Sequence, residues 1–112
     1  MLHKMANRSR HDAAAKKVVS AARALLTYQI GFPVGCQRLS RALAWLKPYE
    51  TNLPTIFDDY LAETVGLPIG SERLEWDRKT LHQKDEALEN INQRFRDPIF
   101  ETCWTILDRF AG

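Results

Sequence analysis

The first candidate for a catalytic site is a histidine next to an aspartate, His11 and Asp12. A carboxylate can orient an imidazole and raise its basicity, as in a proton-relay pair. Adjacent positions at the start of a helix do not face each other, however, and no nucleophile is near in the sequence. We therefore expect Asp12 to cap a helix, and we predict no catalytic residue and no enzyme activity.

Metal and thiol chemistry find little support in the spacing of possible ligands. His3 and His82 stand apart from any metal-ligand pattern, and Cys36 and Cys103 belong to no Cys-x-x-Cys pair. We predict no metal and no cofactor. Both cysteines lie on apolar stripes, so we expect buried free thiols, although a disulfide between them stays open.

Acidic residues and one tryptophan of the second half form a candidate docking surface. Asp59 and Glu63 are four positions apart and share a helix face, but the Glu-x-x-His pairs of carboxylate metal sites in helical bundles are absent. Two interpretations remain, a solvated acidic face and a surface for a basic protein partner. The candidate partner-binding residues are Asp58, Asp59, Glu63, Glu72, Glu75 and Trp76.

Basic residues near the start of the chain could instead contact the phosphates of a nucleic acid. Residues 1–23 contain no Phe, Trp or Tyr for base stacking, so the charge alone supports this alternative. The residues concerned are Arg8, Arg10, Lys16, Lys17 and Arg23.

Two tryptophans of the second half bear on the core. Trp104 lies between Ile99 and Leu107 in an apolar segment, so we expect it in the core. Trp76 follows a loop and either closes the core beneath that loop or serves as an exposed anchor.

Length and composition limit the class of protein. The chain has 112 residues, of which 45% are hydrophobic and 27% charged, so it is too apolar to be disordered throughout. Its apolar stretches are short and no signal sequence is evident, which predicts a cytoplasmic protein without a membrane segment. Residues 1–49 carry nine basic and one acidic side chain, whereas residues 50–112 carry seven basic and thirteen acidic ones. The halves either form separate charged faces or interleave and pair their charges.

The first half predicts a pair of antiparallel helices. Apolar residues recur at helical spacing from Asp12 to Ile30, and we expect Gly31 to end that helix. A second helix is predicted from Pro33 to Trp45, because proline suits the first turn of a helix and the connection is short.

The second half predicts two or three further helices around one structured loop. A third helix is expected from Pro54 to Gly66, and the loop that follows, residues 67–71, contains Pro and Gly yet is apolar enough to pack on the bundle together with Leu74 and Trp76. Asp77 is expected to cap a long helical region that Asp97-Pro98 kinks or divides.

The sequence thus predicts an all-α fold, a compact bundle of four to five helices with one structured Pro/Gly loop. Residues 1–11 are interpreted as a flexible basic tail, and residues 12–112 as a single helical domain.

Two short segments give the chain a resemblance to known sequences. Gly35-Cys36-Gln37-Arg38-Leu39-Ser40 follows the Ala-rich helix, and Arg94-Phe95-Arg96-Asp97 leads into the last one. With these segments, residues 13–110 resemble a family of uncharacterised small helical proteins of proteobacteria, a domain of unknown function. The resemblance implies a bacterial source and no particular mechanism.

Three hypotheses about function follow. The leading one is a non-enzymatic protein-binding module, similar to small bacterial immunity proteins or antitoxins, whose acidic second half docks a basic partner. The alternative is a nucleic-acid-binding regulator that uses the basic first half. The third is an enzyme or small-ligand binder that uses Asp59, Glu63 or Tyr60. A homodimer through the apolar stripe from Leu81 to Phe95 is compatible with all three.

Overall fold

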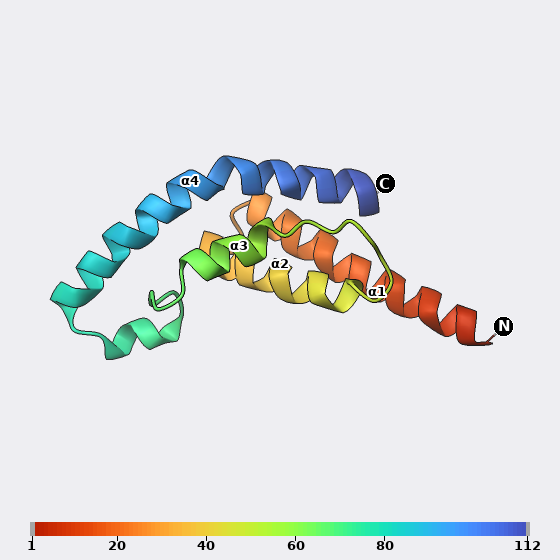
Figure 1. Ribbon diagram of the computed structural model, residues 1–112, viewed down its shortest axis with the longest axis horizontal. Coiled ribbons are helices and arrows are strands. Elements are labelled where there is room, and N and C mark those ends of the chain that lie inside the picture. Colours follow the sequence, from red (N-terminus) through yellow and green to blue (C-terminus); the bar gives the residue numbers. More distant parts are fainter. Residues whose placement is uncertain (1, 112) are drawn as a thin grey trace.

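The computed structural model describes residues 2–111, with side chains from Arg8 to Ala111, and it confirms the all-α prediction. Figure 1 shows helices joined by short connections and one longer loop, in a molecule of 59 × 26 × 23 Å. No strand occurs among the described residues. The helices in this range are α1 (Leu2–Leu26), α2 (Phe32–Leu46), α3 (Ile56–Glu63), the 3₁₀ helix η1 (Ser71–Glu75) and α4 (Arg78–Phe110).

Helices α1 and α2 form the expected antiparallel pair, but the predicted ends of α1 are wrong. Helix α1 begins at Leu2, so residues 2–11 are helical rather than a tail before the helix, and Asp12 lies inside it. No Pro or Gly interrupts residues 2–11, so the helix needs no cap at Asp12. At its other end α1 stops at Leu26, and Tyr28, not Gly31, takes the left-handed conformation. Gly31 instead precedes α2 as its N-cap residue, and Pro33 stands in the first turn as predicted.

Small side chains allow α1 and α2 to pack closely. Ala14, Ala21 and Ala42 are buried in the core cluster, and Gly35 is buried where α2 meets the end of α1. A methyl group added at Gly35 would lie 2.6 Å from the Cδ1 atom of Leu25, which is itself 2% exposed. The two backbones therefore approach each other at a distance that larger residues would not permit.

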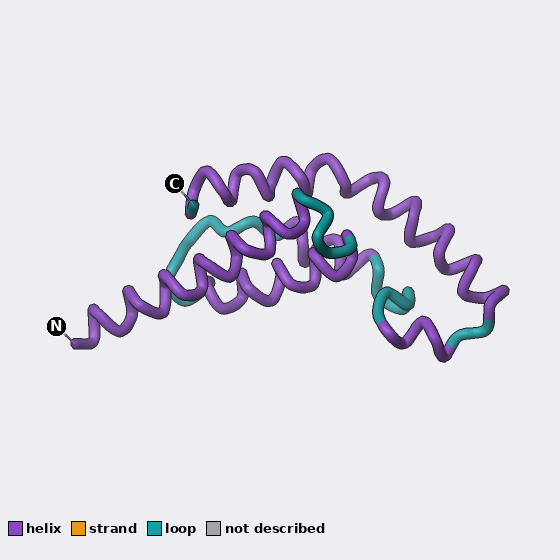
Figure 2. The backbone as a smooth tube through the Cα atoms, turned by 180° about the vertical axis from the view of Figure 1, so that it is seen from behind, coloured by secondary structure: helices purple, strands orange, loops and turns teal. Residues whose placement is uncertain are grey.

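Helix α4 crosses the α1/α2 pair and is one continuous helix through Pro98, which settles the choice between a kinked helix and two helices (Figure 1). Pro98 offers no backbone N–H to the preceding turn, and the helix curves over the bundle (Figure 2). Asp77 caps it as predicted, because its Oδ1 accepts from the backbone N–H groups of Lys79 and Thr80 at 3.0 Å each.

Helix α3 connects α2 to α4 through one buried tyrosine. The ring of Tyr60 packs edge-on against Phe32 of α2 and Phe95 of α4, with centroids 5.2 and 5.6 Å away. Its hydroxyl donates to the side-chain oxygen of buried Asn92 at 2.5 Å. Helix α3 ends before its predicted limit, so Val65, expected on its apolar face, is 81% exposed.

Two further predictions of burial are wrong. Leu74 of η1 is 90% exposed, whereas Pro68 of the loop is buried, so only part of this segment is covered. Trp104 is 59% exposed, because the inward face of α4 is occupied by Cys103 and Ile106 and position 104 turns away from it. The inward stripe of α4 includes buried Leu88 and half-buried Phe95, so these residues face the bundle.

No helix in the range from residue 2 to residue 111 combines the length and the apolar character that a membrane crossing requires.

Two identical substitutions test this packing. Leu46 is fully buried and Leu74 is almost fully exposed. We expect Leu46→Ala to lower the free energy of unfolding by about 2–5 kcal/mol, because a cavity remains in the core. Leu74→Ala is expected to change it by less than about 0.5 kcal/mol. Urea unfolding followed by circular dichroism measures both, and equal losses would contradict the described packing.

Candidate functional site

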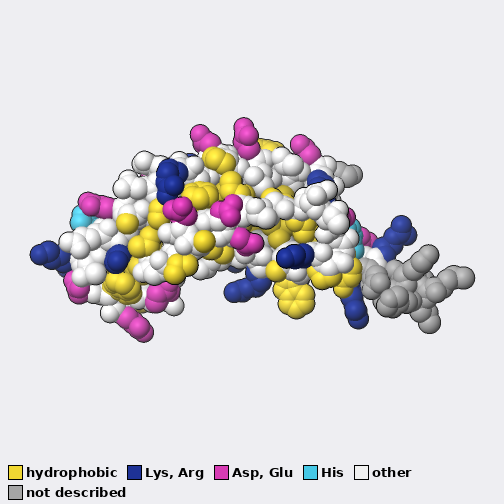
Figure 3. All heavy atoms as spheres, in the orientation of Figure 1, with side chains coloured by type: hydrophobic (Ala, Val, Ile, Leu, Met, Phe, Trp, Pro, Cys, Tyr) yellow, Lys and Arg dark blue, Asp and Glu magenta, His cyan; other side chains and the backbone are white. Residues whose placement is uncertain are grey.

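The surface between α1 and α2 contains two adjoining hollows, which we call the α1/α2 groove. The first encloses about 610 Å³ and the second about 250 Å³. Lys17, Arg41 and Trp45 line both, so the hollows form one continuous groove. Arg10 lines the first hollow and Arg38 the second. In Figure 3, Lys and Arg side chains stand along the lower edge of the molecule, over α1 and α2.

The helical repeat explains why these side chains meet in the groove. On α2, Arg38, Arg41 and Trp45 are spaced by three and four residues and share one face, while Leu39, Leu43 and Leu46 fill the core. On α1, Arg10 and Lys17 are seven residues apart, which places them two turns apart on one side. Small residues between them, including Ala13 and Ala14, form the floor of the first hollow.

The electrostatic character of the groove is uniformly positive. No Asp or Glu lines either hollow. Arg10, Lys17, Arg38 and Arg41 form no salt bridge with any residue that the structure describes. Trp45 is 66% exposed, and the Nζ atom of Lys17 lies 5.9 Å from its ring centroid. The groove therefore combines unpaired cations with an exposed aromatic ring.

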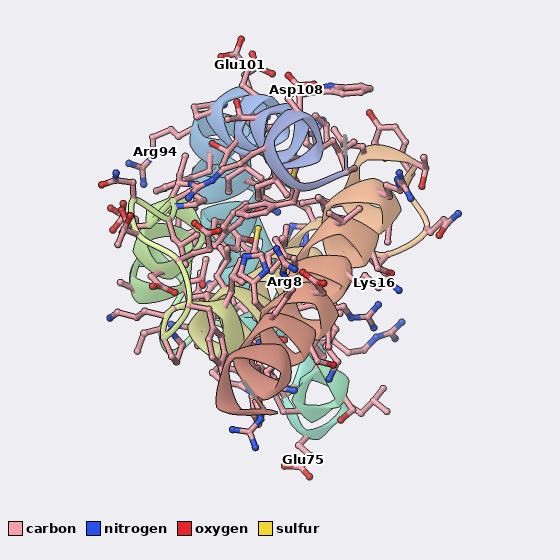
Figure 4. All side chains as sticks on the ribbon, turned by 90° about the vertical axis from the view of Figure 1, so that its right-hand side faces the viewer. Arg8, Lys16, Glu75, Arg94, Glu101 and Asp108 are labelled. Atoms are coloured by element: carbon pink, nitrogen blue, oxygen red, sulfur yellow. The ribbon has the colours of Figure 1, made fainter. Side chains whose placement is uncertain are left out.

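The structure divides the basic residues that the sequence singled out. Arg10 and Lys17 line the α1/α2 groove, whereas Lys16 and Arg23 line a different hollow on another side of α1. Arg8 is exposed on α1 and borders neither (Figure 4). Sequence reasoning missed Arg38, Arg41 and Trp45, although their helical spacing was a signal.

A hydrogen-bonded cluster, which we call the His11 network, lies in the hollow lined by Lys16 and Arg23. The Nδ1 atom of His11 is 3.1 Å from Oδ1 of Asp12, and its Nε2 atom is 2.8 Å from Oε1 of Glu50. The expectation that His11 and Asp12 do not face each other is therefore wrong. Arg109 donates to Glu50 at 3.0 Å and to the carbonyl oxygens of Thr51 and Asn52.

The His11 network links distant parts of the chain, and His11 in it does not resemble a general base. Both ring nitrogens of His11 face carboxylate oxygens, which cannot donate, so the imidazolium form satisfies both contacts at once. The hydrogen bond to Asp12 and then that to Glu50 raise the pKa of His11 above its ordinary value of 6.5. The hydrogen bonds from His11 and then from Arg109 lower the pKa of Glu50 below 4.5. The network joins α1, the α2–α3 connection and the end of α4.

The proposed acidic docking residues are largely engaged within the protein. Asp58 accepts a hydrogen bond from Ser40, and Glu63 pairs with Arg94 at 2.8 Å. Glu72 accepts from two backbone N–H groups of its own loop at 3.0 Å each. The backbone N–H of Glu72 itself, and then those of Ile69 and Gly70, lower the pKa of its carboxyl group.

The other three members of that set lie on α3 and around η1. Asp59 and Glu75 are exposed, and Trp76 is half-buried. The structure thus spreads the predicted docking surface over two elements, and three of its five carboxylates have an internal contact.

The thiols and Tyr60 lie in the core rather than in a site. Cys36 and Cys103 are free and fully buried, as expected. Burial raises the pKa of each thiol to about 12, and Cys103 contributes to the shift at Cys36, so neither forms a ready nucleophile. Burial also raises the pKa of Tyr60, which is fully buried and hence unavailable to a small ligand.

Metal ligands do not converge among the side chains of residues 8–111. No three side chains of His, Cys, Asp or Glu lie where they could share an ion. Even in the His11 network the imidazole stands between the two carboxylates, one on each ring nitrogen.

No protein-family model matches the chain, and no curated protein or solved structure matches it. These comparisons give no support to the resemblance to small proteobacterial helical proteins, so a bacterial source and a cytoplasmic location stay predictions.

The His11 network predicts a pH-dependent stability. Since the folded pKa of His11 is raised, its stabilisation is complete below 6.5 and is lost as the pH rises through the folded value. Since the pKa of Glu50 is lowered, its stabilisation is complete above 4.5 and is lost as the pH falls through the folded value. The network therefore stabilises the folded protein most between about pH 4.5 and about pH 6.5.

We expect the melting temperature of the unmodified protein to fall more than that of His11→Gln between about pH 5.5 and about pH 8.5. His82→Gln is the control, because His82 is exposed on α4, 3.5 Å from Glu86 and outside the network. Differential scanning calorimetry measures the three proteins. A His11→Gln protein with the same pH dependence as the unmodified one would contradict this role.

Proposed function

We propose that this protein binds nucleic acid through the phosphates, which contact the α1/α2 groove. The observation that carries the proposal is the set of cations Arg10, Lys17, Arg38 and Arg41, which line an open groove without a carboxylate and without salt bridges to the described residues. Four like charges held along one groove repel each other, and a polyanion offsets that repulsion while releasing its own counterions.

The salt bridges of the protein support this proposal. The three bridges formed by arginine join Arg73 to Asp85, Arg94 to Glu63 and Arg109 to Glu50, all within residues 50–112. The acidic half therefore pairs with its own arginines. The charges of the two halves do not interleave at the groove, and the excess of Lys and Arg in residues 1–49 stays available to a ligand.

The distribution of acidic residues also favours the approach of an anionic ligand from the side of α1 and α2. Glu101 and Asp108 project from α4, on the side of the molecule away from α1 (Figure 4). Such a separation of charge steers an approaching polyanion toward the basic side.

The docking of a basic protein on the acidic second half stays a prediction. The internal contacts of Asp58, Glu63 and Glu72 reduce the charge that such a surface offers, whereas the groove cations have no such contacts. The geometry therefore favours the nucleic-acid hypothesis.

Neutralising two groove cations tests the proposal. We expect Arg38→Gln/Arg41→Gln to weaken binding of a labelled oligonucleotide about 30-fold at about 0.1 M salt, because each phosphate contact contributes about 0.7–0.9 to the slope of log K against log salt. The slope should become shallower by about 1.4–1.8. Fluorescence anisotropy over a range of salt concentrations gives both values.

The matched control is Arg78→Gln/Arg96→Gln, which removes the same charge from exposed positions of α4 outside the groove. We expect this variant to bind within about twofold of the unmodified protein, because these cations lie away from the phosphates. Equal losses in the two double variants would show that net charge, not the groove, determines binding. Absence of oligonucleotide binding by the unmodified protein would overturn the proposed function.

A further inference from the structure

We propose that the ligand of the groove is single-stranded, and that Trp45 stacks on one of its bases. This inference rests on the proposed function, and it assigns a separate recognition task to one residue of the groove.

Trp45 contributes only a minor part of its surface to the packing of the bundle. A tryptophan is among the largest apolar side chains, and burial of one yields a large hydrophobic gain. Trp45 nevertheless remains 66% exposed, and its side chain lines both hollows of the groove. The indole is therefore available to a flat ligand on the surface that carries the four cations.

Lys17 relates the aromatic ring to the phosphate-binding charges. Its ammonium group lies 5.9 Å from the ring centroid, near the outer limit of a cation–π interaction. A nucleotide presents a flat base and an anionic phosphate on one flexible unit. A cation beside an exposed ring suits that combination, and stacked aromatics within a basic groove are the general means of binding single strands.

The groove also has room for a base beside the ring. Its lining between the cations consists of small residues on both helices, Ala13, Ala14 and Ala44 in the first hollow and Ser20 and Ala21 in the second. Side chains of this size leave the space of about 610 Å³ next to Trp45 open. Tyr49 also lines the first hollow and provides a second aromatic ring there.

A duplex fits this surface less well. The bases of a duplex are stacked on each other and expose only their edges in the grooves, so the face of the indole finds no base to stack on. The major groove admits one α-helix, whereas Trp45 and the cations are distributed over two helices that lie side by side (Figure 2). The phosphates of a duplex could contact the cations, but Trp45 would contribute nothing.

An abasic strand separates stacking from phosphate binding, because it carries the same phosphates without bases. We expect Trp45→Ala to weaken binding of a mixed-sequence single strand of about 16 nucleotides by about 5- to 150-fold. Binding of the abasic strand and of a duplex of equal length should change by less than about twofold. Trp45→Phe keeps an aromatic ring, so its affinity for the single strand should lie between that of the unmodified protein and that of Trp45→Ala. Anisotropy measured at one salt concentration gives all the affinities.

Trp104→Ala is the control, since Trp104 is equally a surface tryptophan, 59% exposed, but lies on α4 outside the groove. It should leave every affinity unchanged. A thermal melt of each variant confirms that it folds, and an exposed position should tolerate the change.

The outcomes separate this inference from the proposed function. If the unmodified protein binds the abasic and the normal strand equally and Trp45→Ala has no effect, stacking is overturned while phosphate binding in the groove stands. If Trp45→Ala weakens duplex binding as much as single-strand binding, the preference for single strands is overturned. If none of the three probes binds, the proposed function fails together with the inference.

Discussion

The close approach of α1 and α2 determines which side chains reach the core and which remain on the surface between the two helices. Buried alanines and Gly35 fill the seam between the two helices, and a single added methyl at Gly35 would collide with Leu25. Helices packed at this distance leave no space for large side chains on the edge of the seam. Arg38, Arg41 and Trp45 therefore project into solvent beside Arg10 and Lys17, and the seam becomes the floor of a groove.

The arrangement of charge follows from which residues find partners. Arginines of the second half pair with carboxylates of the second half, and Glu50 engages both Arg109 and His11. The carboxylates that could have neutralised the first half are thus either already engaged or placed elsewhere, as Glu101 and Asp108 are on α4. The protein accordingly keeps one strongly basic surface despite a net charge of only +2.

The sequence predicted the helices well where local signals act alone. Apolar periodicity, Pro33 and the Asp77 cap located α2 and the start of α4, since these depend on neighbouring residues only. The end of α1, the exposure of Leu74 and the exposure of Trp104 depend on how elements pack in three dimensions, which periodicity does not reveal. The sequence predicted only part of the candidate site. Arg10 and Lys17 were among the predicted basic residues, but the aromatic residue of the groove, Trp45, comes from another helix. A search for aromatics restricted to residues 1–23 could not find it.

The His11 network and the groove, although they lie on different sides of α1, are mechanically connected. Arg10 lines the groove and the next residue, His11, bonds to Glu50. Glu50 in turn follows Pro48 and Tyr49 in the chain, and both of these residues line the first hollow. Because Arg109 also donates to Glu50 and to the carbonyl groups of residues 51 and 52, the segment that contains these lining residues is held by both α1 and α4. The network therefore holds this part of the groove in a defined shape, and under the proposed function such an arrangement would reduce the ordering cost of binding.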